Sequence, residues 1–134
     1  MDITDQTLIE RAASVVAARR IGDYLVGDVG CALVTDTGRV YTGVCMDVSC
    51  GIGFCAEHSA IAAMLTAGEN CIAKIVAVWK DEHGVVSVLA PCGRCREFMR
   101  QIQEGALDTL VILGRDEVVT LADLLPHAGR FQRV

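Results

Sequence analysis

Two short motifs place cysteines where they could bind one metal ion together. Cys55-Ala56-Glu57 and Pro91-Cys92-Gly93-Arg94-Cys95 each stand at the expected start of a helix. A Cys-x-x-Cys spacing at a helix start directs both sulfurs toward one point, and the helix dipole with its free N–H groups favours the thiolate that zinc requires. Cys55 reaches that point from the other helix. Three protein ligands leave a fourth tetrahedral position for water, which is typical of catalytic zinc.

Glu57 follows Cys55 by two residues and supplies the base that such a site needs. Zinc lowers the pKa of a bound water far below its bulk value, so hydroxide forms near neutral pH. We expect Glu57 to accept the proton and deliver it to a leaving amine. A ligand, one spacer and Glu, followed later by Pro-Cys-x-x-Cys, are the signature of the zinc deaminases.

Two other interpretations of the cysteines remain open at this point. Cys92 and Cys95 alone would also suit a redox dithiol, which favours a helix start too. His58 lies three positions after Cys55 and could close the site as a fourth ligand. The chain would then be a non-catalytic, zinc-stabilised binding module, but a structural site gives no reason for Glu57 beside the metal.

Hydrophobic periodicity indicates the elements that position these motifs. A possible N-cap at Thr4 predicts a first helix up to about Arg20, and Asp36-Thr37-Gly38 reads as the turn of a hairpin. The further helices are expected at 56–68, from about 92, and at 121–125; the strands are expected at 30–35, 39–44, 72–79, 85–89 and 109–113. This order predicts a three-layer α/β/α domain.

Length and composition limit the kind of protein. The 134 residues, 52% of them hydrophobic, suit a single domain spanning 1–134. The net charge of -5 argues against a polynucleotide partner. Apolar runs are too short for a bilayer and the first residues lack the basic start of a signal peptide, so we expect no membrane partner and a cytoplasmic location. Seven cysteines, an odd number, agree with metal binding and burial rather than a disulfide framework.

The chain resembles the cytidine deaminase family, specifically its short Cys-liganded zinc class, which includes blasticidin S deaminase. The resemblance rests on Val29-Gly30-Cys31-Ala32-Leu33, Gly43-Val44, Cys55-Ala56-Glu57 and Pro91-Cys92-Gly93-Arg94-Cys95-Arg96. It implies a five-stranded mixed sheet with flanking helices, a Zn²⁺ cofactor, a small nucleoside substrate and a homotetramer or dimer. It also implies that Glu57 protonates N3 of the pyrimidine while water attacks C4. Another amino-heterocycle, such as blasticidin S or a modified nucleoside, is the alternative substrate.

The chain departs from the family around the expected substrate. Where nucleoside-specific members have Asn-x-Glu to hold the ribose, this sequence has Cys45-Met46-Asp47, and Gly27 stands where an aromatic residue would lie near the substrate. The candidate substrate contacts are Cys45, Asp47, Phe54 and Ala56. Phe54 either lines the pocket or anchors the following helix.

Three thiolates on one zinc ion leave a net charge near minus one, which weakens the acidification of water. The helix N-termini compensate in part, and Arg94 and Arg96 are candidates to donate hydrogen bonds to sulfur. In many family members an Arg follows the catalytic Glu, whereas this chain has His58. Compensation by a histidine depends on pH.

We therefore predict that His58→Ala changes the pH profile of activity more than it changes zinc content. The measurement is kcat/KM between about pH 5 and 8, the range in which histidine titrates, with zinc determined on the same samples. An unchanged profile would contradict a role for His58 in charge compensation.

Overall fold

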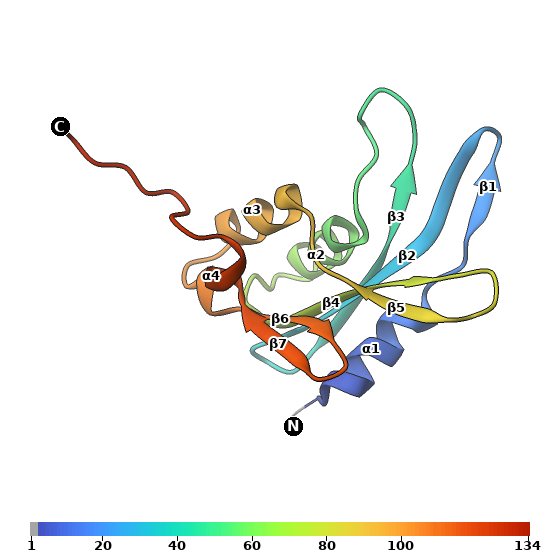
Figure 1. Ribbon diagram of the computed structural model, residues 1–134, viewed down its shortest axis with the longest axis horizontal. Coiled ribbons are helices and arrows are strands. Elements are labelled where there is room, and N and C mark those ends of the chain that lie inside the picture. Colours follow the sequence, from blue (N-terminus) through green and yellow to red (C-terminus); the bar gives the residue numbers. More distant parts are fainter. Residues whose placement is uncertain (1–2) are drawn as a thin grey trace.

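A long antiparallel pair of strands forms the centre of a mixed sheet, and the remaining elements are arranged around it (Figure 1). The computed structural model describes residues 3–134. Its helices are α1 (Asp5–Ser14), α2 (Ala56–Thr66), α3 (Gly93–Gln101) and α4 (Leu121–Leu124), with a 3-10 turn at Ala106–Asp108. Its strands are β1 (Arg19–Ile21), β2 (Tyr24–Thr35), β3 (Val40–Asp47), β4 (Ile72–Lys80), β5 (Val86–Leu89), β6 (Leu110–Gly114) and β7 (Glu117–Thr120).

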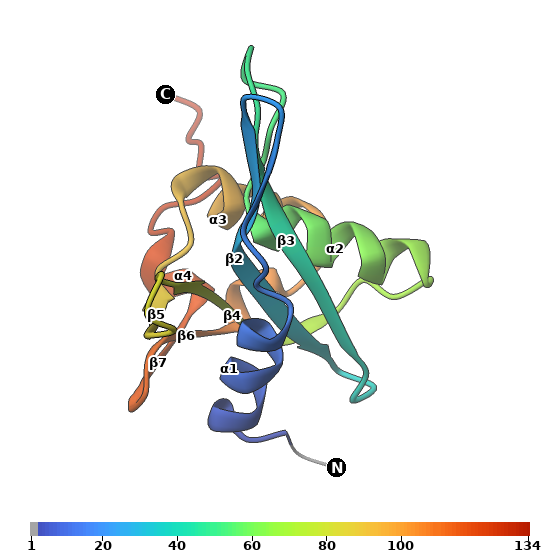
Figure 2. The same cartoon turned by 90° about the vertical axis from the view of Figure 1, so that its right-hand side faces the viewer.

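Helices cover both faces of the sheet, as predicted. Alternate residues of β2 enter different cores, because successive side chains of a strand point to opposite faces. Ala32 and Val34 pack with α1, while Cys31 and Leu33 pack with α2 and α3. Figure 2 shows α1 and α2 on opposite sides of β2 and β3. The three-layer α/β/α prediction is confirmed, and α2 and α3, the helices that begin at the cysteine motifs, share one face.

Two glycines on neighbouring strands allow α1 and α2 to approach the sheet closely. A Cβ at Gly30 on β2 would lie 2.4 Å from the carbonyl oxygen of Ala12 in α1. A Cβ at Gly43 on β3 would lie 2.4 Å from the backbone nitrogen of Ala60 in α2. Neither backbone atom can move away as the end of a flexible side chain could. The short distances between the sheet and these two helices therefore require glycine at positions 30 and 43.

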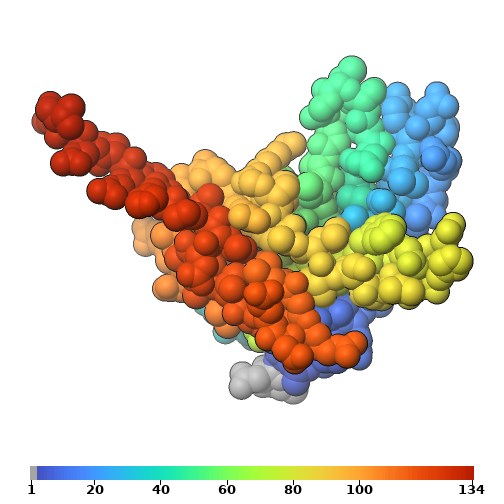
Figure 3. Space-filling model, in the orientation of Figure 1, coloured from blue at the N-terminus to red at the C-terminus, as the bar shows by residue number. Residues whose placement is uncertain are grey.

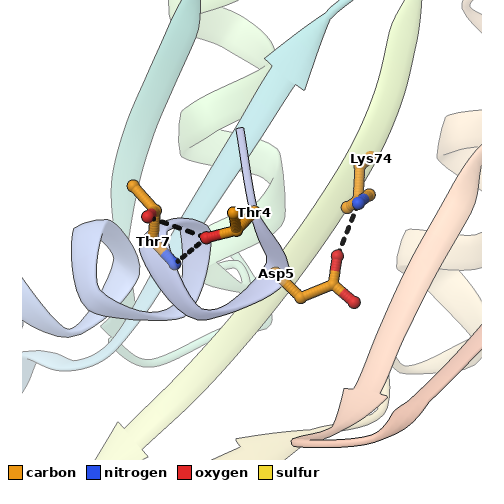
Figure 4. A network of polar contacts seen from close by, with 4 residues as sticks. All are labelled: Thr4, Asp5, Thr7 and Lys74. Carbon is orange, nitrogen blue, oxygen red and sulfur yellow. Dashed lines mark hydrogen bonds and ion pairs between the residues drawn. The ribbon is translucent and has the colours of Figure 1, made fainter. Parts of the chain in front are cut away.

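The start of α1 is fixed by its cap and by the sheet (Figure 4). The Thr4 hydroxyl accepts a hydrogen bond from the Thr7 N–H at 3.1 Å, which confirms Thr4 as the N-cap. Asp5, in the first turn, forms an ion pair with Lys74 of β4. The cap thus fixes where the helix begins, and the ion pair joins its first turn to β4.

The first helix is shorter than predicted. It ends at Ser14 rather than near Arg20, because Arg19–Ile21 instead forms β1 and pairs with Tyr24, Leu25 and Val26. Gly22, with φ +63°, makes the tight turn between the two strands. Ile21 is 54% exposed, and β1 contributes no buried side chain to the core.

The sheet also has more strands than the five implied by the family resemblance. Seven strands occur within residues 3–134, in the order β1-β2-β4-β6-β7, with β3 paired to β2 and β5 paired to β4. The additional pairings are short. β1 pairs with the first residues of β2, and β5 and β6 pair with different parts of β4. β7, which was not predicted, pairs antiparallel with β6.

No helix in the described part of the chain is long and apolar enough to span a membrane.

Gly30→Ala should destabilise the fold, because its Cβ would collide with the backbone of α1. Overpacking of this kind costs about 1–3 kcal/mol. The measurement is the free energy of unfolding from urea titrations. Gly114→Ala is the matched control, since a Cβ there would meet only Glu117 at 3.9 Å; equal effects of the two substitutions would contradict the close-approach explanation.

Candidate active site

Cys55 and Cys92 occupy the N-cap positions of α2 and α3. Both have extended backbone conformations, and neither side chain makes a capping hydrogen bond. Ser, Asp or Asn would serve better as caps, at a difference of about 1 kcal/mol. The two sulfurs are thus placed at helix starts without being used to stabilise them, which leaves both available to a ligand.

The third sulfur completes a compact triangle. Cys95, in the first turn of α3, is fully buried, and its Sγ lies 3.4 Å from that of Cys92, which lies 3.5 Å from that of Cys55. Two corners of a tetrahedron with Zn–S bonds of about 2.3 Å are about 3.8 Å apart, so this donor set fits zinc. Within residues 3–134, these cysteines are the only group of His, Cys, Asp or Glu side chains arranged to hold a metal ion.

The three thiols differ in how readily they ionise. Burial, followed by the neighbouring Cys92 thiol, raises the pKa of Cys55 to about 11. Burial and then the charge of Glu57 raise the pKa of Cys95. Burial also acts to raise the pKa of Cys92, but the Cys95 N–H and the neighbouring sulfurs outweigh it, and that pKa is lowered. Since a metal binds thiolates, its uptake must displace protons from Cys55 and Cys95.

Glu57 is buried beside this triangle, with only 5% of its surface exposed. Burial raises the pKa of its carboxyl above the ordinary value, although its backbone N–H and the Cys95 thiol act in the opposite direction. A raised carboxyl pKa is a property of groups that exchange protons near neutral pH. Glu57 is therefore suited chemically to both accepting and returning a proton.

His58 contacts the sulfur cluster from outside. Its Nδ1 lies 3.4 Å from the Sγ of Cys95, and its ring stacks on Phe98 with centroids 4.5 Å apart. The centroid of the Phe54 ring lies 6.0 Å from that of His58. Burial and then the charge of Arg94 lower the pKa of His58, which favours the neutral ring. Aromatic packing thus holds the His58 ring within hydrogen-bond distance of the Cys95 sulfur.

The two arginines of the second motif lie in different places. Arg94 lines the pocket beside Cys92. Arg96 donates from Nε to the carbonyl of Pro91 at 2.8 Å and from its guanidinium to the carbonyl of Leu124 at 3.0 Å. Its hydrogen bonds thus join the segment before α3 to the end of α4 instead of reaching a sulfur.

A pocket of about 450 Å³ opens next to the sulfurs and Glu57. Figure 3 shows a notch between the green loop that follows β3 and the gold start of α3. The predicted substrate contacts all line this pocket; they are Cys45, Asp47, Phe54 and Ala56. Cys55, Glu57, Cys92 and Arg94 line it too, so the structure brings most of the predicted site together.

The loop between β3 and α2 is pinned at its base. Met46 and Phe54 exchange backbone hydrogen bonds of 3.0 and 3.2 Å. A Cβ at Gly53 would lie 2.3 Å from the carbonyl oxygen of Met46, so the loop closes only with glycine there. This closure delivers Phe54 to the pocket wall and Cys55 to the start of α2.

One residue of the pocket was missed by the sequence analysis. Asp28 lines the pocket from β2, and its Oδ1 accepts a hydrogen bond of 2.9 Å from the Cys45 thiol. A lone carboxylate within an otherwise apolar strand could have indicated it. Gly27 beside it has φ +85°, and a Cβ there would lie 2.6 Å from the Ala17 carbonyl oxygen, so no aromatic residue fits this position.

Comparison with known proteins agrees with this geometry. The model of the family described as the cytidine and deoxycytidylate deaminase zinc-binding region matches residues 3–111. The chain belongs to this family. It is accordingly a zinc-dependent hydrolytic deaminase, and the interpretations as a redox dithiol or a non-catalytic zinc module do not hold.

Relatives match over most of the chain. A cytidine deaminase from Mycobacterium tuberculosis is 35% identical over 132 residues, which cover 96% of this chain and 92% of that protein. A blasticidin-S deaminase from Bacillus cereus is 30% identical over 103 residues, covering 73% and 74%. The crystal structure of cytidine deaminase from Mycobacterium tuberculosis superposes with a TM-score of 0.76 at 31% identity, over 97% of this chain and all of that one.

Cys92→Ser should abolish tight zinc binding, because it removes one of only three clustered sulfurs. Metal analysis after gel filtration should give about one zinc per chain for the wild type and close to none for the variant. Cys71→Ser is the matched control, since Cys71 is a free thiol outside the cluster. Retention of zinc by the Cys92 variant would show that the metal is held elsewhere.

Proposed function

We propose that this chain deaminates an unphosphorylated cytidine-type nucleoside, cytidine or deoxycytidine, and releases ammonia. The observation that supports this most is the convergence of three sulfurs and one buried carboxylate on a single pocket. The pocket has the size range of small-molecule sites. The metal ligands are Cys55, Cys92 and Cys95, and Glu57 is the catalytic acid and base.

Zinc, when bound, supplies a water whose pKa is lowered toward neutral. Glu57 takes a proton from the attacking water and gives it to N3 of the pyrimidine, so that C4 becomes more electrophilic. Once the C–O bond has formed, Glu57 takes the remaining proton from the new hydroxyl group on C4 and gives it to the amino group; the C4–N bond breaks, ammonia leaves and the hydroxyl oxygen becomes the carbonyl. Burial of Glu57 in the pocket wall keeps bulk water from competing for these protons.

The charges of the pocket favour a nucleoside over a nucleotide. Asp28, Asp47 and Glu57 contribute three carboxyl groups to the wall, against the single guanidinium of Arg94. A phosphate would meet net repulsion from these groups. The family includes deaminases of both cytidine and deoxycytidylate by its description, so this charge balance supports the unphosphorylated substrate class.

Blasticidin S or a modified nucleoside is the second candidate substrate. It is supported by the likeness to the Bacillus cereus blasticidin-S deaminase and by the positions of Cys45 and Asp47, which depart from the ribose-binding pattern of the family. Ammonia release measured with cytidine, deoxycytidine, cytosine and blasticidin S separates the candidates, since each predicts a different best substrate.

The active form is a homotetramer or dimer located in the cytoplasm. Ile52, in the loop beside the pocket, is 72% exposed, and Phe131, in the tail that extends from the body (Figure 1), is 93% exposed. Burial of these two apolar side chains against another subunit would be favourable, because it removes apolar surface from water. The free state of all seven cysteines is what a reducing compartment maintains.

Glu57→Gln should lower kcat for cytidine about 100-fold or more, because general acid–base catalysis contributes factors of that order. Zinc content should stay at the wild-type value, since Glu57 lies outside the ligand cluster. Ammonia release and metal analysis on the same sample measure both. Glu104→Gln, at an exposed position, is the control and should leave kcat unchanged; wild-type activity in the Glu57 variant would contradict the proposed mechanism.

A further inference from the structure

Asp28 stands in a bulge of β2 that faces the pocket. Strands β2 and β3 pair regularly through Val26↔Met46 and again from Gly30↔Val44, so three residues of β2 oppose only Cys45. Bulges re-aim side chains and occur beside active sites. Gly27 begins this one with φ +85° against the Ala17 carbonyl, which only glycine allows without strain. The backbone therefore brings Asp28 to the pocket wall.

Cys45 holds the Asp28 carboxylate in one orientation. Its thiol donates to Asp28 Oδ1 at 2.9 Å, while the Val29 N–H donates to its Sγ at 3.4 Å. Cys45 is only 7% exposed. Burial, followed by the hydrogen bond to Asp28, raises the pKa of the thiol, so it keeps its proton as a donor. Its one hydrogen is thus committed to Asp28 and not available to a ligand.

The second carboxylate oxygen of Asp28 is available. No other hydrogen bond to this carboxylate occurs in the part of the chain that the structure describes, and the residue is half-buried at the lining of the pocket. Asp47 lines the same pocket but is exposed. An oriented, half-buried carboxylate loses less entropy and competes with less water when it accepts a hydrogen bond than an exposed one does.

We propose that Asp28 is the specificity-determining residue that accepts a hydrogen bond from the sugar hydroxyls of the nucleoside, with Cys45 as its positioning residue. This inference rests on the proposed function of a nucleoside deaminase. It assigns sugar recognition to the bulge of β2, whereas the ordinary ribose-binding positions in β3 hold Cys45 and Asp47. The site selects a substituent that donates hydrogen bonds and carries no negative charge.

The test compares Asp28→Ala with wild type on cytidine, 2′,3′-dideoxycytidine and 5′-deoxycytidine, which share one reacting ring and differ in hydroxyls. A lost hydrogen bond to a charged group lowers kcat/KM for cytidine roughly 10- to 100-fold, mainly through KM. The analogue that lacks the recognised hydroxyl is expected to change little. Asp116→Ala, at an exposed turn, is the control and should leave all three substrates unaffected.

A second pair of variants tests the positioning by Cys45. Cys45→Ser keeps a donor toward Asp28 and should retain most of the preference for cytidine over the analogue. Cys45→Val has similar volume but no donor, and should lose the preference as Asp28→Ala does. Zinc content and unfolding midpoints, measured on every variant, separate loss of recognition from loss of folding.

Equal losses on cytidine and on both analogues would mean that Asp28 acts on the fold alone, and would overturn the inference. Unchanged activity of Asp28→Ala on cytidine would overturn it as well. In both cases wild-type activity on cytidine leaves the proposed function standing. A zinc-loaded wild type that deaminates no cytidine would contradict the proposed function itself, and this inference with it.

Discussion

The structure depends on bringing the first residues of two helices to one point. Cys55 and Cys92 are N-caps without capping bonds, and the sulfur of Cys95 lies within a few ångströms of both. Buried thiols resist ionisation together, as the raised pKa values of Cys55 and Cys95 show. A divalent cation reverses that balance, so metal binding and the packing of α2 against α3 reinforce each other.

Several contacts elsewhere in the fold fix the positions of these two helix starts. The glycines at 30 and 43 set the distances between sheet and helices on the two faces. The bridge between Met46 and Phe54 closes the loop that leads into α2, and Arg96 joins the segment before α3 to the end of α4. A rigid sheet and two fixed helix starts hold the reacting groups in the precise positions that proton transfer needs.

Sequence reasoning succeeded where chemistry and periodicity were local. The spacing of Cys92 and Cys95, the capping by Thr4 and the hairpin turn at 36–38 depend on near neighbours, and the structure has them as predicted. It failed where strand pairing decided the outcome. Arg19–Ile21 became a strand because Tyr24–Val26 offered a partner, and Asp28 entered the pocket only through a bulge that depends on Ala17 and Cys45. The β1–β2 hairpin is local, and its two-residue turn Gly22-Asp23 is a hairpin signal that the helical periodicity obscured. The contact of Asp28 with Cys45 joins residues 17 positions apart, which no window of adjacent residues reveals.

The mechanism requires an open zinc site with three sulfur ligands, and X-ray absorption at the zinc edge measures that ligand set. The zinc-loaded wild type should show three sulfurs at about 2.3 Å and one oxygen at about 2.0 Å. His58→Ala should leave this shell unchanged, since its ring contacts the Cys95 sulfur from outside the cluster. A nitrogen ligand in the fourth position that disappears in the His58 variant would mean a closed site without a position for water, and would contradict an open catalytic zinc site.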